Sequence, residues 1–278
     1  MSTAFRAILE GSQEVPPNQS TAQGLGTVIF DNTAVTASYS FRIEGVDYGP
    51  ATGAPPQTPA TEDDVVSTHF HNEARGVNGP VVFGQINPAH DDDDLAIVQN
   101  TDGSWTVSGL WETTDPANVP IDNFAADLGG AAVGSEVPLY FNVHTTQFPA
   151  GEIRGQLIAI ADDNDNIVAG TTGNDSLPGL GGDDVLVGLA GDDRLDGGAG
   201  NDVLTGSDGV DVFAFTGQDF GADTITDFED GTDKILLSGA ANAIEDSSNG
   251  AVVTFGTGTV LIVGVNAADL NADDFLTS

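Results

Sequence analysis

A nine-residue period governs residues 170–214, and this repeat constrains the fold more than any other feature of the chain. Five consecutive units begin at Gly170, Gly179, Gly188, Gly197 and Gly206. Every unit has Gly at its fourth position, Asp at its sixth and Leu or Phe at its eighth. A flexible Gly/Asp linker would not keep an acid at every sixth position. The period therefore predicts a stacked, repetitive fold in which each unit is one structural repeat.

The recurring acid predicts a metal-binding edge. If each unit forms one turn, its Asp stacks on those of the neighbouring turns, and like charges repel unless a cation lies between them. Calcium takes six to eight oxygen ligands, which these carboxylates and the carbonyls of the glycine turns can supply. The eighth-position side chains then point inward as one apolar column: Leu177, Leu186, Leu195, Leu204 and Phe213.

These units resemble the RTX (repeats-in-toxin) family, whose pattern Gly-Gly-x-Gly-x-Asp-x-apolar-x forms a calcium-binding parallel β-roll. The resemblance covers 170–214. It implies calcium ligands at the sixth position, with further ligands at the fifth: Asp175, Asp184, Asp193, Asp202 and Asp211, and Asn174, Asp183, Asp192 and Asn201. The end copies should be weaker, because Pro178 limits strand pairing in the first and Val210 replaces Asn or Asp in the last.

Residues 215–278 are predicted to form a β cap that ends in an export signal. The segment 223–237 looks like the strand cap that closes many RTX modules. Two apolar runs, 252–255 and 260–263, flank Gly256-Thr-Gly258 and predict a hairpin. The ending Asp273-Asp-Phe-Leu-Thr-Ser278 resembles the C-terminal signal read by type I secretion systems. The type I secretion apparatus is therefore an expected partner.

The charge balance excludes two classes of partner. The chain has 43 Asp plus Glu against 6 Lys plus Arg, a formal net charge of −37 at pH 7. It lacks the cations that neutralise phosphate, so we expect no binding to nucleic acid or anionic membranes. No apolar run approaches the roughly 20 residues of a membrane span. Without cysteine, neither disulfides nor thiolate metal sites are available. We expect a secreted protein, free or associated with the cell surface.

Residues 1–161 are predicted to form a Greek-key β-sandwich, which makes the whole chain all-β. Short apolar or alternating runs, such as 35–43 and 105–111, are separated by clusters of Gly, Pro, Asn and Asp. The acidic run Asp162-Asp-Asn-Asp-Asn166 lacks the Gly and the terminal Glu of an EF-hand loop. We therefore expect 162–169 to be an acidic linker between the sandwich and the roll.

Three segments of this half resemble the CHRD (chordin) domain family: Gly11–Pro17, Thr68–Val82 and Asn142–Gln156. The resemblance spans essentially the whole half. Members of the family are known as extracellular β-sandwiches, in many cases without an assigned activity. The resemblance thus implies an extracellular sandwich and leaves its function open.

All four histidines lie in this half: His69, His71, His90 and His144. His69 and His71 are two residues apart, so in a strand both side chains point to one face. His144 lies in another apolar run, which could pair beside the first. Three neutral imidazoles on neighbouring strands suit copper or zinc. The alternative is that these are scattered structural histidines.

The same features are remotely similar to copper–zinc superoxide dismutases, which are also β-sandwiches. Carried over position by position, His69, His71 and His144 would be copper ligands, His90 could complete the site, and Arg154 would guide the anion. The zinc-ligand loop and the disulfide of that family are missing, and the net charge repels superoxide. Two functions stay open: a copper-dependent superoxide dismutase, or a non-enzymatic extracellular binding or matrix protein stabilised by calcium.

Overall fold

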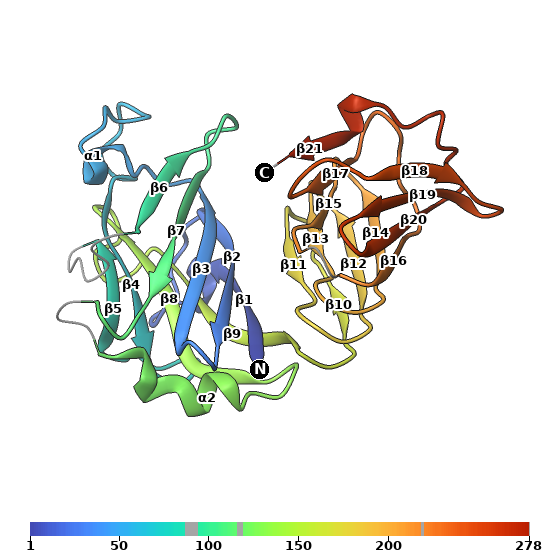
Figure 1. The fold of residues 1–278 in the computed structure, drawn as a ribbon. Helices are drawn as coiled ribbons and strands as arrows, with labels where there is room; N and C mark the ends of the chain where they lie inside the picture. The colour runs from blue at the N-terminus through green and yellow to red at the C-terminus, as the bar shows by residue number, and fades with distance from the viewer. Residues whose placement is uncertain (87–93, 116–118, 218–219, 278) are drawn as a thin grey trace. The chain divides into compact units, whose positions relative to one another are not determined.

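The computed structural model describes residues 1–86, 94–115, 119–217 and 220–277 (Figure 1). The chain divides into two compact units, Met1–Ile160 and Ala161–Ser278. Both consist mainly of strands, so the all-β prediction is confirmed. In the described part of the chain, no helix has the length and apolar character that a membrane crossing requires.

The first unit is a nine-stranded antiparallel sheet. In sheet order its strands are β5 (Val81–Ile86), β4 (Val65–Asn72), β8 (Glu136–Thr145), β9 (Ile153–Asp162), β1 (Ser2–Glu10), β2 (Gln23–Asp31), β3 (Thr36–Glu44), β7 (Trp105–Trp111) and β6 (Ala96–Gln99). Short helical turns connect them: η1 (Gly11–Gln13), α1 (Gly49–Thr52), η2 (Ile121–Phe124) and α2 (Ala125–Gly129). Strand β4 is not a neighbour of β3, nor β8 of β7, so the chain crosses between the two halves of the sheet as in a Greek key.

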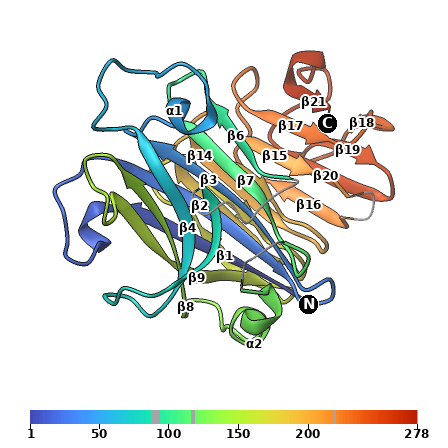
Figure 2. The same ribbon diagram turned by 90° about the vertical axis from the view of Figure 1, so that its left-hand side faces the viewer.

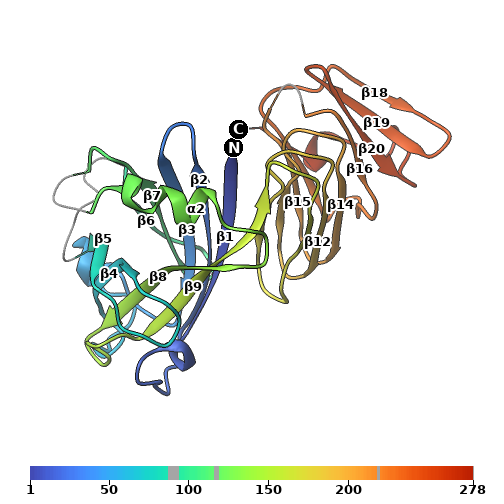
Figure 3. The same cartoon turned by 90° about the horizontal axis from the view of Figure 1, so that it is seen from below.

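The sheet curves so that its two halves pack face to face (Figures 2 and 3). Phe41 of β3 stacks on Phe141 of β8, with 3.8 Å between ring centroids, although β9, β1 and β2 separate these strands within the sheet. Phe70 of β4 packs edge-on against Tyr39 of β3, with 5.7 Å between centroids. The core therefore lies between opposed halves, which confirms the predicted sandwich.

The core occupies one face of β4, β8 and β9. Leu139, Phe141 and Val143 of β8 belong to it. Because side chains alternate along a strand, Tyr140 and His144 point to the opposite face, which we call the outer face. It is buried as well, since both of these side chains are less than a tenth exposed.

The second unit is a parallel roll of two sheets (Figure 1). One sheet contains β10 (Ile167–Ala169), β12 (Val185–Ala190), β14 (Val203–Asp208), β16 (Ala222–Ile225) and β20 (Gly258–Val263); the other contains β11 (Ser176–Pro178), β13 (Arg194–Asp196), β15 (Val212–Phe215), β17 (Lys234–Leu237) and β21 (Phe275–Thr277). Within the repeats, paired residues such as Leu186 and Leu204 are 18 apart in sequence. One turn of the roll therefore contains two nine-residue units.

This corrects the expected single apolar column. All five eighth-position side chains are completely buried, as predicted, but they form two columns. Leu177, Leu195 and Phe213 stack in one sheet, and Leu186 and Leu204 in the other. The physical reason is that nine residues supply only one short strand and one glycine turn, so a second unit is needed to bring the chain back.

Both ends of the roll extend beyond the repeats. Strand β10 lies inside 162–169, where we expected a linker, and pairs in parallel with β12. At the other end, β19 (Gly250–Phe255) and β20 pair antiparallel, which confirms the predicted hairpin, and β18 (Ala243–Asp246) joins them. After η3 (Ala272–Asp274), the terminal β21 pairs with β17 as an edge strand.

Candidate metal centres

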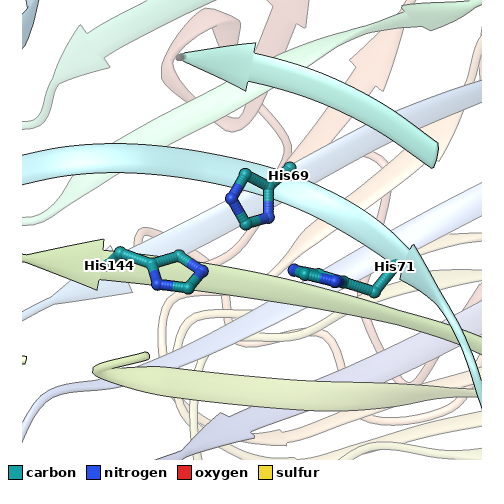
Figure 4. A group of neighbouring side chains, drawn as sticks. All are labelled: His69, His71 and His144. Atoms are coloured by element: carbon teal, nitrogen blue, oxygen red, sulfur yellow. The ribbon is translucent and has the colours of Figure 1, made fainter. Parts of the chain in front are cut away.

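Three histidines meet on the outer face of β4 and β8, where their rings surround a common space (Figure 4). One ring nitrogen from each of His69, His71 and His144 lies within 4.8 Å of the other two. The ring centroid of His69 is 4.5 Å from that of His71 and 4.6 Å from that of His144. Strands β4 and β8 are antiparallel neighbours, as the sequence suggested. His90 lies outside the described residues.

Backbone carbonyls orient two of the three rings. His71 Nδ1 lies 2.8 Å from the carbonyl oxygen of Gly79, and His144 Nδ1 lies 3.2 Å from that of Pro149. A carbonyl only accepts, so each Nδ1 carries the proton and the lone pair of the neutral ring is on Nε2. Both Nε2 atoms are buried and have no hydrogen-bond partner among the described residues. Metal-binding histidines commonly donate their other N–H in this way.

Burial keeps these imidazoles neutral. Desolvation is the main cause that lowers the pKa of His71 to about 4; the charges of His144 and Arg154 act in the same direction, and the hydrogen bond with Gly79 opposes them. Desolvation also holds the pKa of His144 below its usual value. Neutral rings are the protonation state that binds a metal ion. Near neutral pH, His71 and His144 are therefore in the protonation state that can bind a metal ion.

Tyr140 separates Arg154 from the histidines. The strand order β4, β8, β9 places His71, Tyr140 and Arg154 on three neighbouring strands, with Tyr140 in the middle. The His71 ring stacks on the Tyr140 ring at 4.7 Å, and the Arg154 guanidinium carbon lies 3.6 Å from the centroid of the same ring. Arg154 is 1% exposed and donates to the Val77 carbonyl and to Asn78 Oδ1. It lies near the histidines, but in a buried layer behind Tyr140.

The three segments that resemble the CHRD family meet at this outer face. Asn78 Nδ2 of the second segment donates to the Val15 carbonyl of the first, at 2.9 Å. Gln156 Nε2 of the third donates to the Glu73 carbonyl of the second, at 3.0 Å. Segments that are distant in sequence are therefore joined beside β8 and β9, where the three histidines are less than a tenth exposed.

Glu14 is a buried acid of this region to which sequence reasoning assigned no role. Its side chain is 4% exposed, and burial raises its pKa to about 7, although the Arg154 charge and a hydrogen bond from Asn142 act in the opposite direction. Its Oε1 is buried without a hydrogen-bond partner among the described residues. The only sequence signal for Glu14 is its place in the first of the three segments.

In the roll, the sixth-position acids line two edges. Asp175, Asp193 and Asp211 follow one another along one edge, and Asp184 and Asp202 along the other; none is more than 4% exposed. The backbone N–H of each acid donates to Oδ1 of the acid one turn later, as from Asp175 to Asp193 at 2.8 Å. The second oxygen, Oδ2, of Asp184, Asp193, Asp202 and Asp211 is buried without a hydrogen-bond partner in the described part of the chain.

The buried carboxylates along these two edges favour the binding of cations. Burial is the main cause that raises the pKa of Asp184 and of Asp193 to about 7; the charges of neighbouring acids act in the same direction, and a backbone hydrogen bond to each opposes them. The pKa values of Asp202 and Asp211 are raised by burial as well. A buried carboxylate oxygen without a donor is unfavourable unless a cation binds it. The first-position glycines leave room for this oxygen, since a Cβ on Gly188 would collide with Asp193 Oδ2.

The fifth-position residues are more exposed and hold successive turns together. Their side-chain oxygens accept backbone N–H groups from the turn that follows: Asp192 N to Asn174, Asn201 N to Asp183, Val210 N to Asp192 and Ala222 N to Asn201, at 2.8–3.1 Å. These oxygens are therefore already engaged. By contrast, the Oδ2 atoms of Asp184, Asp193, Asp202 and Asp211 are buried and accept no hydrogen bond from the described residues.

The two ends of the aspartate edges differ from the centre. In the first copy, Asp175 Oδ2 accepts from the backbone N–H and the hydroxyl of Thr171, at 2.6 and 2.9 Å. At the other end, Asp223 lies outside the repeats but continues the edge, because its Oδ1 accepts from Asp202 N at 2.9 Å. Its Oδ2 is buried without a partner among the described residues. The nonapeptide pattern could not identify this residue.

Comparisons with known proteins match both halves. The CHRD domain family profile matches residues 5–157, and that of the RTX calcium-binding nonapeptide repeat (4 copies) matches 160–193 and 178–213. A search of curated proteins found no match.

Several solved structures resemble the chain. Two subunits of the Azotobacter vinelandii mannuronan C5-epimerase are 34% and 32% identical, each covering 42% of this chain and 80% and 91% of its own, with TM-scores of 0.37 and 0.34. The extracellular lipase LipA from Serratia marcescens is 21% identical over 66% of this chain and 29% of its own, with a TM-score of 0.30.

Proposed function

Because the chain belongs to the CHRD domain family and carries RTX calcium-binding repeats, we propose that it is a secreted calcium-binding protein whose CHRD domain holds a copper ion. The ligands are His69, His71 and His144. The observation that carries this proposal is the orientation of two rings, because His71 and His144 turn their Nδ1–H groups to backbone carbonyls and leave buried Nε2 atoms toward the cluster. Among divalent first-row metals, such a nitrogen site binds copper most tightly, with zinc below it.

For the roll, we assign calcium to the sixth-position acids. Asp184, Asp193, Asp202 and Asp211 provide the buried Oδ2 atoms that need a cation. Asp175 contributes less, since it ends its edge and has an acid, Asp193, on one side only. The fifth-position side chains Asn174, Asp183, Asp192 and Asn201 act mainly through their hydrogen bonds between turns.

Superoxide dismutase activity is the second candidate. The His-x-His pair with a third histidine on the neighbouring strand favours it, and Arg154 lies close by. Two observations weigh against it: Arg154 is buried behind Tyr140 instead of facing an incoming anion, and the net charge of −37 repels superoxide. A site of this kind suits a metal with a structural or storage role better than one with rapid anion turnover.

Elemental analysis of the full-length protein, purified without chelators, separates these functions. We expect stoichiometric copper together with several calcium ions. A His71→Ala/His144→Ala variant should lose copper and keep its calcium. If the protein contains calcium but no transition metal, the remaining function is that of a non-enzymatic, calcium-stabilised binding or matrix protein. A dismutase assay on the copper-loaded protein then decides whether the metal centre is catalytic.

A further inference from the structure

Asn142 occupies the centre of the outer face that carries the three histidines. It lies directly opposite His69 of β4 on one side and Arg154 of β9 on the other. Along β8 it is two residues from Tyr140 and from His144, so all three side chains share a face. Its side chain is 3% exposed. Asn142 is thus as deeply buried as the histidines and is a direct neighbour of two of them.

The two ends of the Asn142 amide have different surroundings. Its side chain forms a hydrogen bond with Glu14 that favours the charged carboxylate, so the Nδ2 group donates to Glu14. The other end, Oδ1, is buried and has no hydrogen-bond partner among the described residues. A buried acceptor without a donor is unfavourable. The arrangement therefore calls for a hydrogen-bond donor next to Oδ1.

The neighbouring side chains direct their donors to other acceptors. Arg154 donates to the Val77 carbonyl and to Asn78 Oδ1. The Nδ1–H groups of His71 and His144 donate to the backbone. None of these donors reaches Asn142 Oδ1, and we assign its donor to a small molecule bound beside the histidines.

A three-histidine site offers such a molecule a place. Three protein nitrogens leave a fourth coordination position free for an exogenous ligand. We propose that Asn142 Oδ1 lines this position. It makes the metal centre prefer a ligand that donates a hydrogen bond, which is water or hydroxide, to an anion that only accepts hydrogen bonds. Glu14 is the positioning residue, because it binds Nδ2 and keeps Oδ1 turned to the ligand. The inference rests on the proposed three-histidine metal site.

Azide tests this selectivity, because it is a small anion that binds copper and accepts hydrogen bonds without donating any. The copper-loaded, full-length protein is titrated with azide, and binding is followed by the charge-transfer absorption. Asn142→Leu removes the acceptor at similar size, and azide affinity should rise by roughly tenfold, the effect of one hydrogen-bonding group. Asn142→Asp keeps the acceptor and adds negative charge, so azide affinity should fall.

The controls separate this inference from the proposed function. Gln156→Leu removes another buried amide, which donates to the Val137 and Leu139 carbonyls, and should leave azide affinity unchanged. The role of Asn142 is overturned if copper-loaded Asn142→Leu binds azide as tightly as the wild type does. If the Leu variant does not fold, the same result with Asn142→Asp overturns it. A wild-type protein that takes up no copper overturns the metal centre itself.

Discussion

His71 and Tyr140 lie opposite each other on β4 and β8, and their rings are parallel, with 4° between the planes and 4.7 Å between the centroids. Gly79 forms a hydrogen bond with each of these side chains. Its carbonyl accepts from His71 Nδ1, and its N–H donates to the Tyr140 hydroxyl at 3.1 Å. The direction of one nitrogen of the proposed metal site therefore depends on a tyrosine that is not among the proposed ligands.

Replacing Tyr140 with Leu should weaken copper binding about tenfold or more, because residues that orient a ligand typically contribute that much to metal affinity. Competition with a chromophoric chelator measures the change. Tyr140→Phe, which keeps the stacked ring and loses only the bond from Gly79, should have a smaller effect. Calcium binding serves as an internal control and should not change. Unaltered copper affinity in the Leu variant would contradict the orienting role.

Glu14 makes the stability of the metal-free sandwich depend on pH. Burial raises its pKa from 4.5 to about 7, so protonation favours the folded state. This contribution is fully present below pH 4.5 and is lost as pH rises through 7. Glu14→Gln should therefore be more stable than the wild type at pH 8, by about 1–3 kcal/mol, and close to it at pH 4.5. Urea unfolding of the metal-free protein at both pH values measures this; a gain of equal size at both would refute the assignment.

Protons should partly replace calcium in the roll. Without calcium, burial raises the pKa of Asp184, Asp193 and Asp223 from 3.8 to about 7. Protonation of these acids stabilises the roll below pH 3.8, and this effect disappears as pH rises through 7. We expect full-length protein in chelator to show more β-structure by circular dichroism at pH 5 than at pH 8, and calcium to restore it at pH 8. A spectrum that does not change with pH would count against buried acids at the edges.

Asp193→Ala should impair the calcium response more than Asp175→Ala. Asp193 lies between Asp175 and Asp211 on its edge, whereas Asp175 ends that edge and has an acid on one side only. We expect the calcium midpoint of Asp193→Ala to rise about tenfold, the loss of one charge-assisted contact, and that of Asp175→Ala to change little. The two variants are matched in chemistry, so equal midpoints would show that the edges do not bind calcium as proposed.

Deletion of residues 271–278 should keep the protein inside cells that have a type I exporter. The deletion removes η3 and the edge strand β21 and leaves β17 in place. The His71→Ala/His144→Ala variant, altered in the other unit, should be exported normally. Quantifying protein in medium and cells checks both. Normal export of the truncated chain would locate the signal elsewhere.

The repeats allowed the roll to be predicted, but not the number of residues in its turn. A period of nine fixes which side chains are equivalent, and Leu177 and Leu186 are indeed both buried. It does not say whether equivalent residues stack directly or alternate between two sheets. That depends on how many residues the chain needs to return to its starting side, and strands as short as β11 and β13 need two units.

The histidine cluster was predictable for a different reason. The i, i+2 spacing of His69 and His71 sets their shared face, and the resemblance to known families pointed to His144. The partners of these rings were not predictable. Tyr140 and Asn142 meet β4 only through the register of β8, and Glu14 reaches them from a loop whose path no local pattern specifies.

The hydrogen bonds along the aspartate edges give the roll a direction of assembly. Asp175 N donates to Asp193, Asp193 N to Asp211, and Asp211 N to Asp233 of the cap. Each buried sixth-position amide therefore finds its acceptor in the turn that follows it in sequence, whereas the exposed fifth-position hydrogen bonds run in the opposite direction. Growth away from the C-terminal cap gives every sixth-position amide an acceptor already in place, whereas growth from the other end would bury these amides before their acceptors exist. For these buried amides the cap supplies the first acceptor, which favours adding the repeats to it in reverse order of sequence.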